Sequence, residues 1–176
     1  AKSLVVLDHH KTAQAELEGL DFCVFDMDKS GARLAWEFFS DNKTKSPWLV
    51  DYAEDADLWK WSLPSSREVK AALSATPWTF KEFDDLARDI EVPIPIISNG
   101  IAIETFRETM IDAAVRNATE IEMAGHKVLC VNVSSSALIS DVGHRLAIDR
   151  PFSVTWFQTG NKYVYSLRST PAGLDV

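Results

Sequence analysis

Cysteine and long hydrophobic runs are both scarce in this 176-residue chain. The two cysteines, Cys23 and Cys130, lie far apart and each within an apolar run, so we expect buried strand thiols and not a disulfide or a metal pair. No apolar stretch reaches membrane-spanning length, and the N-terminal residues do not have the pattern of a signal peptide. We therefore expect a cytoplasmic chain in a reducing compartment, with no membrane partner.

Positively charged residues are also fewer than negatively charged ones. The chain has 18 Lys and Arg residues against 26 Asp and Glu residues, which gives a net charge of −8 and a pI of about 5.0. A broad basic surface, which a protein needs to bind long duplex nucleic acid, is therefore excluded. A small phosphate substrate is not excluded, because clustered aspartates are also how a protein holds hard cations.

The first half of the chain contains an alternation of strand and helix patterns. Residues 3–7 and 21–26 are short apolar or β-branched runs typical of strands, whereas residues 11–18 suit a helix. Another helix is predicted after Ser30, which can cap it, and three amphipathic helices follow within residues 47–89. This order predicts a parallel sheet with helices on its faces, a partial Rossmann-like domain over residues 1–97.

The second half begins with a long helical pattern. Apolar residues form a stripe from residue 98 to about 123, and Gly125 is a plausible stop, so residues 98–125 are predicted to be a connecting helix. After the boundary near residue 125 we expect a strand, a helix and then a hairpin around residues 159–161. Residues 126–176 are therefore predicted to form a small mixed-sheet α/β domain, and the fold class is α/β.

The first predicted strand ends in Asp8, His9 and His10. In open α/β sheets functional groups gather at the carboxyl ends of strands. Carboxylate and neutral imidazole together are ligands for divalent transition metals such as Mn²⁺, Fe²⁺, Co²⁺ or Zn²⁺. The alternative is that the two histidines are a helix cap and a surface residue.

A second group of acidic side chains lies in the segment DYAEDADLW, residues 51–59. A helix there would place Asp51 and Asp55 on one face with Glu54 beside them, and Asp57 follows closely. Taken alone, such a run is more often a solvated helix face. The acidic segment becomes a candidate metal site only in combination with the histidines.

Three segments of the first half, VLDHHKTA, FDMDKSGARLAWEFF and LVDYAEDADLWKW, resemble the DHH phosphoesterase superfamily, in the branch of oligoribonucleases that degrade nanoRNA. In the second half, NVSSSALISDVGHRLA, RPFSVTWFQ and YVYSLRSTPAGLDV resemble the DHH-associated substrate domain of the same branch. The resemblance covers nearly the whole chain, in order and at the family's spacing.

The resemblance implies a hydrolase site with two Mn²⁺-type ions that activate water for attack on a phosphoester. By the family's motif His9 would be a metal ligand and His10 would face the substrate phosphate. Asp8 would not contact the ion and would orient the two histidines. The later aspartate ligand would be Asp55, with Asp57 as the second choice. In the associated domain, Arg168 and Ser169 would face the nucleotide phosphate, although Arg168 in an alternating hairpin is equally compatible with a surface position.

The resemblance is incomplete at both ends. Two aspartate motifs that precede the Asp-His-His motif in the family, and a Gly-Gly-Gly-His loop that follows the second domain, do not occur in these residues. We therefore expect a fragment of a phosphoesterase for very short RNA or a nucleoside 3',5'-bisphosphate, inactive or nearly so by itself. The alternative is a non-catalytic module that associates with itself as a homodimer and binds at most one metal ion.

Overall fold

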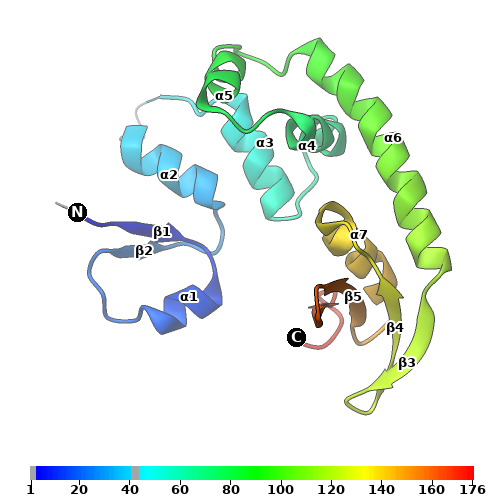
Figure 1. Cartoon of the computed structure of the whole chain (residues 1–176). Coiled ribbons are helices and arrows are strands. Elements are labelled where there is room, and N and C mark those ends of the chain that lie inside the picture. The colour runs from blue at the N-terminus through cyan, green and yellow to red at the C-terminus, as the bar shows by residue number, and fades with distance from the viewer. Residues whose placement is uncertain (1–2, 41–43) are drawn as a thin grey trace. The chain divides into compact units, whose positions relative to one another are not determined.

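The computed structural model describes residues 3–40 and 44–176, and the chain divides into two compact units. Unit 1 extends to Glu104 and unit 2 begins at Thr105. The described residues form a two-stranded parallel sheet in unit 1 and a four-stranded mixed sheet in unit 2 (Figure 1). The predicted α/β class is therefore confirmed.

Unit 1 begins with a β-α-β arrangement. Strand β1 (Val6–Asp8) pairs in parallel with β2 (Cys23–Phe25), and helix α1 (Lys11–Glu16) lies between them in the sequence. Because the strands are parallel, the carboxyl end of β1 and the carboxyl end of β2 lie at the same edge of the sheet. This edge is where the sequence predicts the functional residues.

Four helices follow in unit 1: α2 (Gly31–Ser40), α3 (Trp48–Asp57), α4 (Ser66–Ala75) and α5 (Phe80–Ala87). The predicted cap of α2 is confirmed, because the Ser30 hydroxyl accepts a hydrogen bond from the Arg33 backbone N–H at 3.1 Å. The buried Trp48 joins α3 to α5 by donating its indole N–H to the Leu86 carbonyl at 3.2 Å. The core of this helical part is completed by Leu34, Val69, Ala71 and Ala72.

The long helix α6 is Ile94–Arg116, and the predicted range of 98–123 was wrong at both ends. It begins earlier because Pro95 stands in its first turn, where a missing N–H costs no hydrogen bond. It ends earlier because the sequence TEIEM, residues 119–123, alternates polar and apolar side chains and forms strand β3. The predicted boundary near residue 125 therefore falls inside a hairpin, and the predicted limits of 1–97, 98–125 and 126–176 differ from the two compact units.

Unit 2 contains the mixed sheet, in the order β3-β4-β5-β6. Strand β3 (Thr119–Met123) pairs antiparallel with β4 (His126–Asn132), which pairs in parallel with β5 (Ser153–Thr159) after helix α7 (Ser136–Ala147). Strand β6 (Lys162–Arg168) completes the predicted hairpin, whose turn contains Gly160 at φ +56°. The predicted strand, helix and hairpin of this half are confirmed.

Apolar side chains are buried on both faces of the mixed sheet. One cluster joins the end of α6 and α7 to β4, and it is formed by Ile111, Val131, Val133, Val142 and Leu146. The other cluster, on the opposite face, consists of Val128, Phe152 and Val154 with Ile121, Met123 and Cys130 packed against it. Within the described residues, no helix combines the length and apolar character needed to span a bilayer.

Candidate metal centre at the end of strand β1

Asp8, His9 and His10 occupy the junction between β1 and α1. Asp8 is the last residue of β1, and His10 is the N-cap of α1 in an extended conformation, with φ −94° and ψ 124°. The short parallel strand thus delivers all three side chains to the carboxyl edge of the sheet. One possible ligand atom from each residue lies within 4.8 Å of the others.

The Asp8 carboxylate fixes the arrangement of the two histidines. Its Oδ1 accepts hydrogen bonds from the His9 backbone N–H at 2.7 Å and the His10 backbone N–H at 3.3 Å. The same oxygen lies 2.7 Å from Nδ1 of His10, and this hydrogen bond is the main cause of the lowered pKa of Asp8. Asp8 is therefore ionised at neutral pH and orients the His10 ring.

The two imidazoles differ in their surroundings. The His9 side chain is largely buried, at 15% exposed, and its Nε2 lies 3.2 Å from Oδ2 of Asp57. The His10 side chain is 67% exposed, and the two ring centroids are 4.4 Å apart. His9 is thus directed into the protein toward a carboxylate, whereas His10 is open to solvent.

Asp57 and Asp55, the two carboxylates predicted as later ligands, have separate environments. Asp57 is half-exposed and contacts His9. The aspartate that lies next to the histidines is therefore Asp57, which was predicted as the ligand only in second place after Asp55. Asp55 is 3% exposed, and its oxygens accept hydrogen bonds from Ser62, Leu63 and Ser66. Its carboxylate is taken up by these hydrogen bonds from the turn after α3 and the start of α4, so Asp57 is the better candidate ligand.

Asp51 and Glu54 in the same segment form ion pairs with the side chain of Arg33. Arg33 of α2 donates to Asp51 Oδ1 at 2.6 Å and to Glu54 Oε2 at 3.3 Å. Lys60 Nζ lies 3.6 Å from the other oxygen of Glu54. These ion pairs join α2 to α3, and they leave Asp57 as the carboxylate of this helix that faces His9.

Asp26 is a further carboxylate at this edge that the sequence analysis did not select. It directly follows β2, and its backbone N–H donates to the Asp8 carbonyl at 3.2 Å. The Asp28 backbone N–H donates to its carboxylate at 3.0 Å, which is the main cause of its lowered pKa, and Lys29 Nζ lies 3.3 Å away. The signal was present in the sequence, because Asp26 follows the second parallel strand as Asp8 follows the first.

Arg168 and Ser169, the predicted phosphate contacts, lie in unit 2 at the end of β6. Arg168 is partly buried, and one of its terminal nitrogens donates to the Ser140 hydroxyl of α7 at 2.8 Å. Its Nε is buried and has no hydrogen-bond partner among the residues that the structure describes. A guanidinium with an unused N–H donor is suited to bind an anion.

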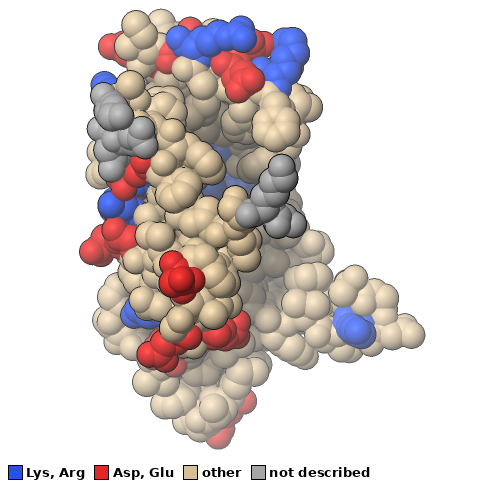
Figure 2. Space-filling model, turned by 90° about the vertical axis from the view of Figure 1, so that its left-hand side faces the viewer, with Lys and Arg blue, Asp and Glu red and all other residues tan. Residues whose placement is uncertain are grey.

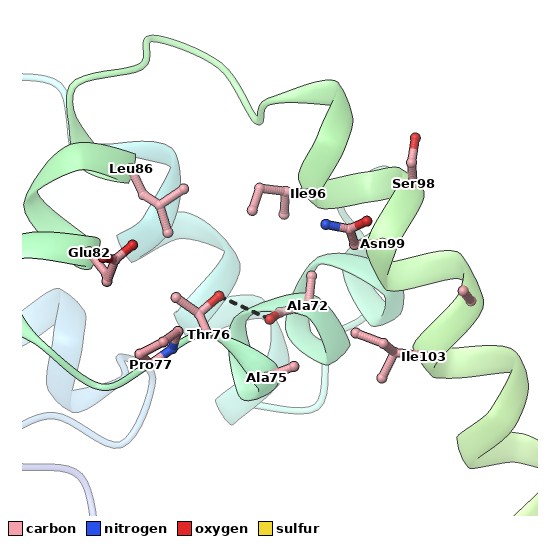
Figure 3. A pocket seen from close by; sticks show the side chains of 11 residues that line it. Ala72, Ala75, Thr76, Pro77, Glu82, Leu86, Ile96, Ser98, Asn99 and Ile103 are labelled. Carbon is pink, nitrogen blue, oxygen red and sulfur yellow. Dashed lines mark hydrogen bonds between the residues drawn. The ribbon is translucent and has the colours of Figure 1, made fainter.

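A separate hollow lies among α4, α5 and the start of α6, in unit 1 (Figure 3). Its volume is about 540 Å³, and its walls include Ala72, Leu86, Ile96 and Ile103. Thr76, on its rim, donates its hydroxyl to the Ala72 carbonyl at 3.1 Å. None of the predicted site residues lines this hollow, and Glu82 is its only charged lining residue among those described.

The surface charge is unevenly distributed. On the face drawn in Figure 2, the largest group of Lys and Arg side chains lies at the upper end, and others stand singly among acidic and uncharged side chains. Acidic side chains are scattered over the rest of that face. This distribution matches the composition, with its excess of Asp and Glu.

Comparison with known proteins yields one distant relative. An uncharacterized protein of Acanthamoeba polyphaga mimivirus is 28% identical over 184 residues, an alignment that covers all of this chain and 44% of the viral protein. The chain thus spans less than half the length of this relative. No protein-family model matches the chain. No solved structure matches it either.

Proposed function

We propose that this chain carries part of a metal-dependent phosphoesterase site whose substrate is a very short RNA or a nucleoside 3',5'-bisphosphate. The observation that carries the proposal is the meeting of Asp8, His9 and His10 at the carboxyl end of a parallel strand, with Asp57 in contact with His9. The resemblance of the surrounding segments to DHH phosphoesterases supplies the reaction class. The separate roles proposed for the residues are argued from their positions in the site.

The donor atoms suit one Mn²⁺-type ion. His9 Nε2 and Asp57 Oδ2, 3.2 Å apart, are the borderline nitrogen and hard oxygen that such ions accept together. Asp26 stands at the neighbouring strand end as a further oxygen donor. Asp8 supports the pair by holding the backbone and ring of His10.

His10, Arg168 and Ser169 would contact the substrate, whereas the ion would activate the attacking water. A bound divalent ion lowers the pKa of water and so supplies a nucleophile at neutral pH. His10, exposed and oriented by Asp8, is placed to donate to a phosphate oxygen. Arg168, with its unused Nε donor, and the adjacent Ser169 would bind a phosphate in unit 2.

The described residues contain one cluster of three or more potential metal ligands. Hydrolysis through two ions needs carboxylates that hold the second ion about 3.5–4 Å from the first. We therefore propose that the chain by itself binds a single ion and turns over little or no substrate. A non-catalytic, self-associating module is the second candidate, and it is favoured by exposed apolar residues at the small sheet of unit 1, namely Leu4 and Val5 just before β1 and Val24 in β2.

The proposal is tested by titrating the purified chain with Mn²⁺ and measuring heat or the loss of the free-ion electron paramagnetic resonance signal. His9→Ala and Asp57→Asn should each weaken binding by about tenfold or more, since they remove a ligand. His126→Ala is the matched control, because His126 packs against Phe152 in unit 2 and should leave Mn²⁺ affinity unchanged. Equal affinities in all four proteins would exclude this site.

The same proteins are then assayed for hydrolysis of a short RNA oligomer in the presence of Mn²⁺. We expect no appreciable turnover by the wild-type chain, because the part of the chain that the structure describes offers one cluster of potential ligands and hydrolysis through two ions needs a second set. Robust Mn²⁺-dependent turnover that His9→Ala abolishes would show that one chain completes the site. That result would overturn the single-ion part of the proposal and retain the phosphoesterase part.

A further inference from the structure

The turn between α3 and α4 contains a buried indole N–H that donates to no residue that the structure describes. Two buried side-chain nitrogens in the described residues lack a hydrogen-bond partner: Nε of Arg168, for which a phosphate is proposed above, and Nε1 of Trp61. Buried polar groups almost always have a partner, because an unpaired group keeps the full cost of its desolvation. An indole N–H can only donate, so the partner that Trp61 requires is an acceptor.

Two cationic side chains lie over the same indole ring. The guanidinium carbon of Arg67 is 4.3 Å from the centroid of the Trp61 ring, and Nζ of Lys70 is 5.7 Å from it. Arg67 and Lys70 are three positions apart in α4, so their side chains leave the helix on the same face. The side-chain nitrogens of all three residues are donors and none of them accepts a hydrogen bond. In a chain with a net charge of −8, this group of side chains is therefore suited to an anion.

The backbone holds the Trp61 ring in a fixed place. Trp59, Trp61 and Ser65 all have positive φ, at 57°, 50° and 53°. The Trp61 backbone N–H donates to the Asp55 carbonyl at 3.4 Å, and the Asp55 carboxylate accepts from the backbone and hydroxyl of Ser62. Unfavourable backbone conformations persist where surrounding contacts enforce them, and they are concentrated at functional sites. The turn thus keeps the indole at one position although its backbone conformation is unfavourable.

The turn begins directly after the proposed metal centre. Asp57, the last residue of α3, lies 3.2 Å from Nε2 of His9, and Trp61 follows it by four residues. Four residues of extended chain reach about 14 Å at most, so the Trp61 backbone lies within that distance of Asp57. All of these residues belong to unit 1. A substrate whose reacting phosphate is at the ion can therefore bring a neighbouring phosphate to Trp61.

We propose that Trp61, Arg67 and Lys70 bind a second, non-reacting phosphate of the substrate. One phosphate carries several acceptor oxygens, so it can accept from the indole N–H and from both cations at once. Hydrogen bonds from arginine and lysine to phosphate are charge-assisted and stronger than those between neutral groups. The identity of the anion rests on the proposed function. The inference adds that the site selects substrates with two phosphates, such as a nucleoside 3',5'-bisphosphate, over phosphomonoesters.

The anion site is tested by nuclear magnetic resonance on the full chain, labelled with ¹⁵N and free of Mn²⁺. The chain has six tryptophans, and the indole signal of Trp61 is the one that Trp61→Phe lacks. Inorganic phosphate, added at constant ionic strength, should shift this signal to saturation and leave that of the exposed Trp78 in place. Arg67→Gln should raise the dissociation constant of phosphate about tenfold or more. Arg88→Gln is the matched control and should not, because Arg88 is 76% exposed and pairs with Asp85 in α5.

The selection of substrates is tested by calorimetry with Mn²⁺ present. Adenosine 3',5'-bisphosphate should bind about tenfold or more tightly than adenosine 5'-monophosphate, since it alone offers a second phosphate. Arg67→Gln and Lys70→Gln should each reduce this difference, whereas Arg88→Gln should retain it. A difference that survives both substitutions on α4 and disappears in Arg168→Gln would assign the second phosphate to unit 2 and overturn the proposal.

The failure of this inference is distinguishable from the failure of the proposed function. A Trp61 signal that phosphate does not move, in a chain whose Mn²⁺ affinity depends on His9, would overturn the anion site and retain the metal site. A Trp61 signal that moves, in a chain whose Mn²⁺ affinity is the same in His9→Ala, would overturn the substrate role. Equal weakening by Arg67→Gln and Arg88→Gln would reveal a general attraction to positive charge and no built site. Circular dichroism shows whether each variant is folded, and Lys70→Gln replaces Arg67→Gln should the latter fail to fold.

Discussion

Asp55 and Asp57 lie two positions apart, yet they differ in almost everything that decides a carboxylate's role. Asp57 is half-exposed and faces His9. Asp55 is buried and accepts from the backbone and hydroxyl of Ser62 and from the hydroxyl of Ser66. Its carbonyl also accepts from the backbone of Trp61, a residue held at φ +50°. Asp55 therefore holds the turn after α3 in a conformation that a tryptophan seldom adopts.

We expect Asp55→Ala to lower the free energy of unfolding by about 2–4 kcal/mol, because several buried donors would lose their acceptor. Asp57→Ala is the control and should change it by about 0.5 kcal/mol or less, as an exposed residue would. Urea denaturation followed by circular dichroism measures both. A similar loss in the two variants would contradict the division of roles.

The stabilisation by Asp55 should also depend on pH. Burial acts to raise the pKa of this group, but the hydrogen bonds from Ser62 and Ser66 outweigh it, so the pKa lies below its ordinary value of 3.8. A lowered pKa in the folded state means that the stabilisation is complete above about pH 3.8 and is lost as the pH falls through the folded-state pKa. In Asp55→Asn this part of the acid dependence should be absent.

Sequence patterns could locate this acidic segment but not choose within it. The resemblance to DHH phosphoesterases pointed to Asp55 as the ligand, with Asp57 second, and helical spacing placed Asp51 and Asp55 on one face. The deciding contacts are those of Asp55 with Ser62 and Ser66, which lie in the turn and in the next helix. Such contacts depend on how the chain folds back, so periodicity alone does not contain them.

Among the elements, the backbones of α4 and α6 approach each other closely at Gly100. A Cβ on Gly100 of α6 would overlap the backbone carbonyl of Glu68 in α4. The absence of a side chain at this buried glycine is therefore a condition for the packing of the two helices. Glycine inside a helix normally costs stability, and here close packing offsets that cost.

Gly100→Ala should therefore destabilise the protein by about 1–3 kcal/mol, since backbone cannot move aside as a flexible side chain does. Gly31→Ala, at the start of α2, is the matched control, because no atom lies within 4 Å of its new Cβ. The control should be neutral or stabilising by up to about 1 kcal/mol. Thermal unfolding of both variants checks the contrast, and a neutral Gly100→Ala would mean that the two helices separate easily.

The extent of elements was harder to predict than their order. The strand β3 was taken for the end of the long helix because Ile121 and Met123 continue an apolar pattern that fits either period over five residues. Its pairing with β4 decides in favour of the strand. The start of α6 was placed too late because the apolar stripe begins at residue 98, whereas the helix begins at Ile94 with Pro95 in its first turn.

At the scale of the molecule, the α/β class followed from the alternation of strand and helix patterns, and the structure bears it out in both units. The carboxyl edge of β1 and β2 was also predictable, since parallel strands bring Asp8 and Asp26 to the same side. The boundary between the two units could not be predicted, because it falls within α6, whose sequence pattern does not change there.

The topology of the mixed sheet has a consequence for how unit 2 folds. Its two hairpins, β3-β4 and β5-β6, close over short turns, whereas the parallel partners Asn132 and Trp156 are 24 residues apart with α7 between them. Long-range parallel pairing is slow because loop closure precedes its contacts. In pulsed hydrogen exchange during refolding, the amides that join β4 to β5 should gain protection after those that join β3 to β4. Simultaneous protection of all four strands would instead mean that the central crossover organises the unit from the start.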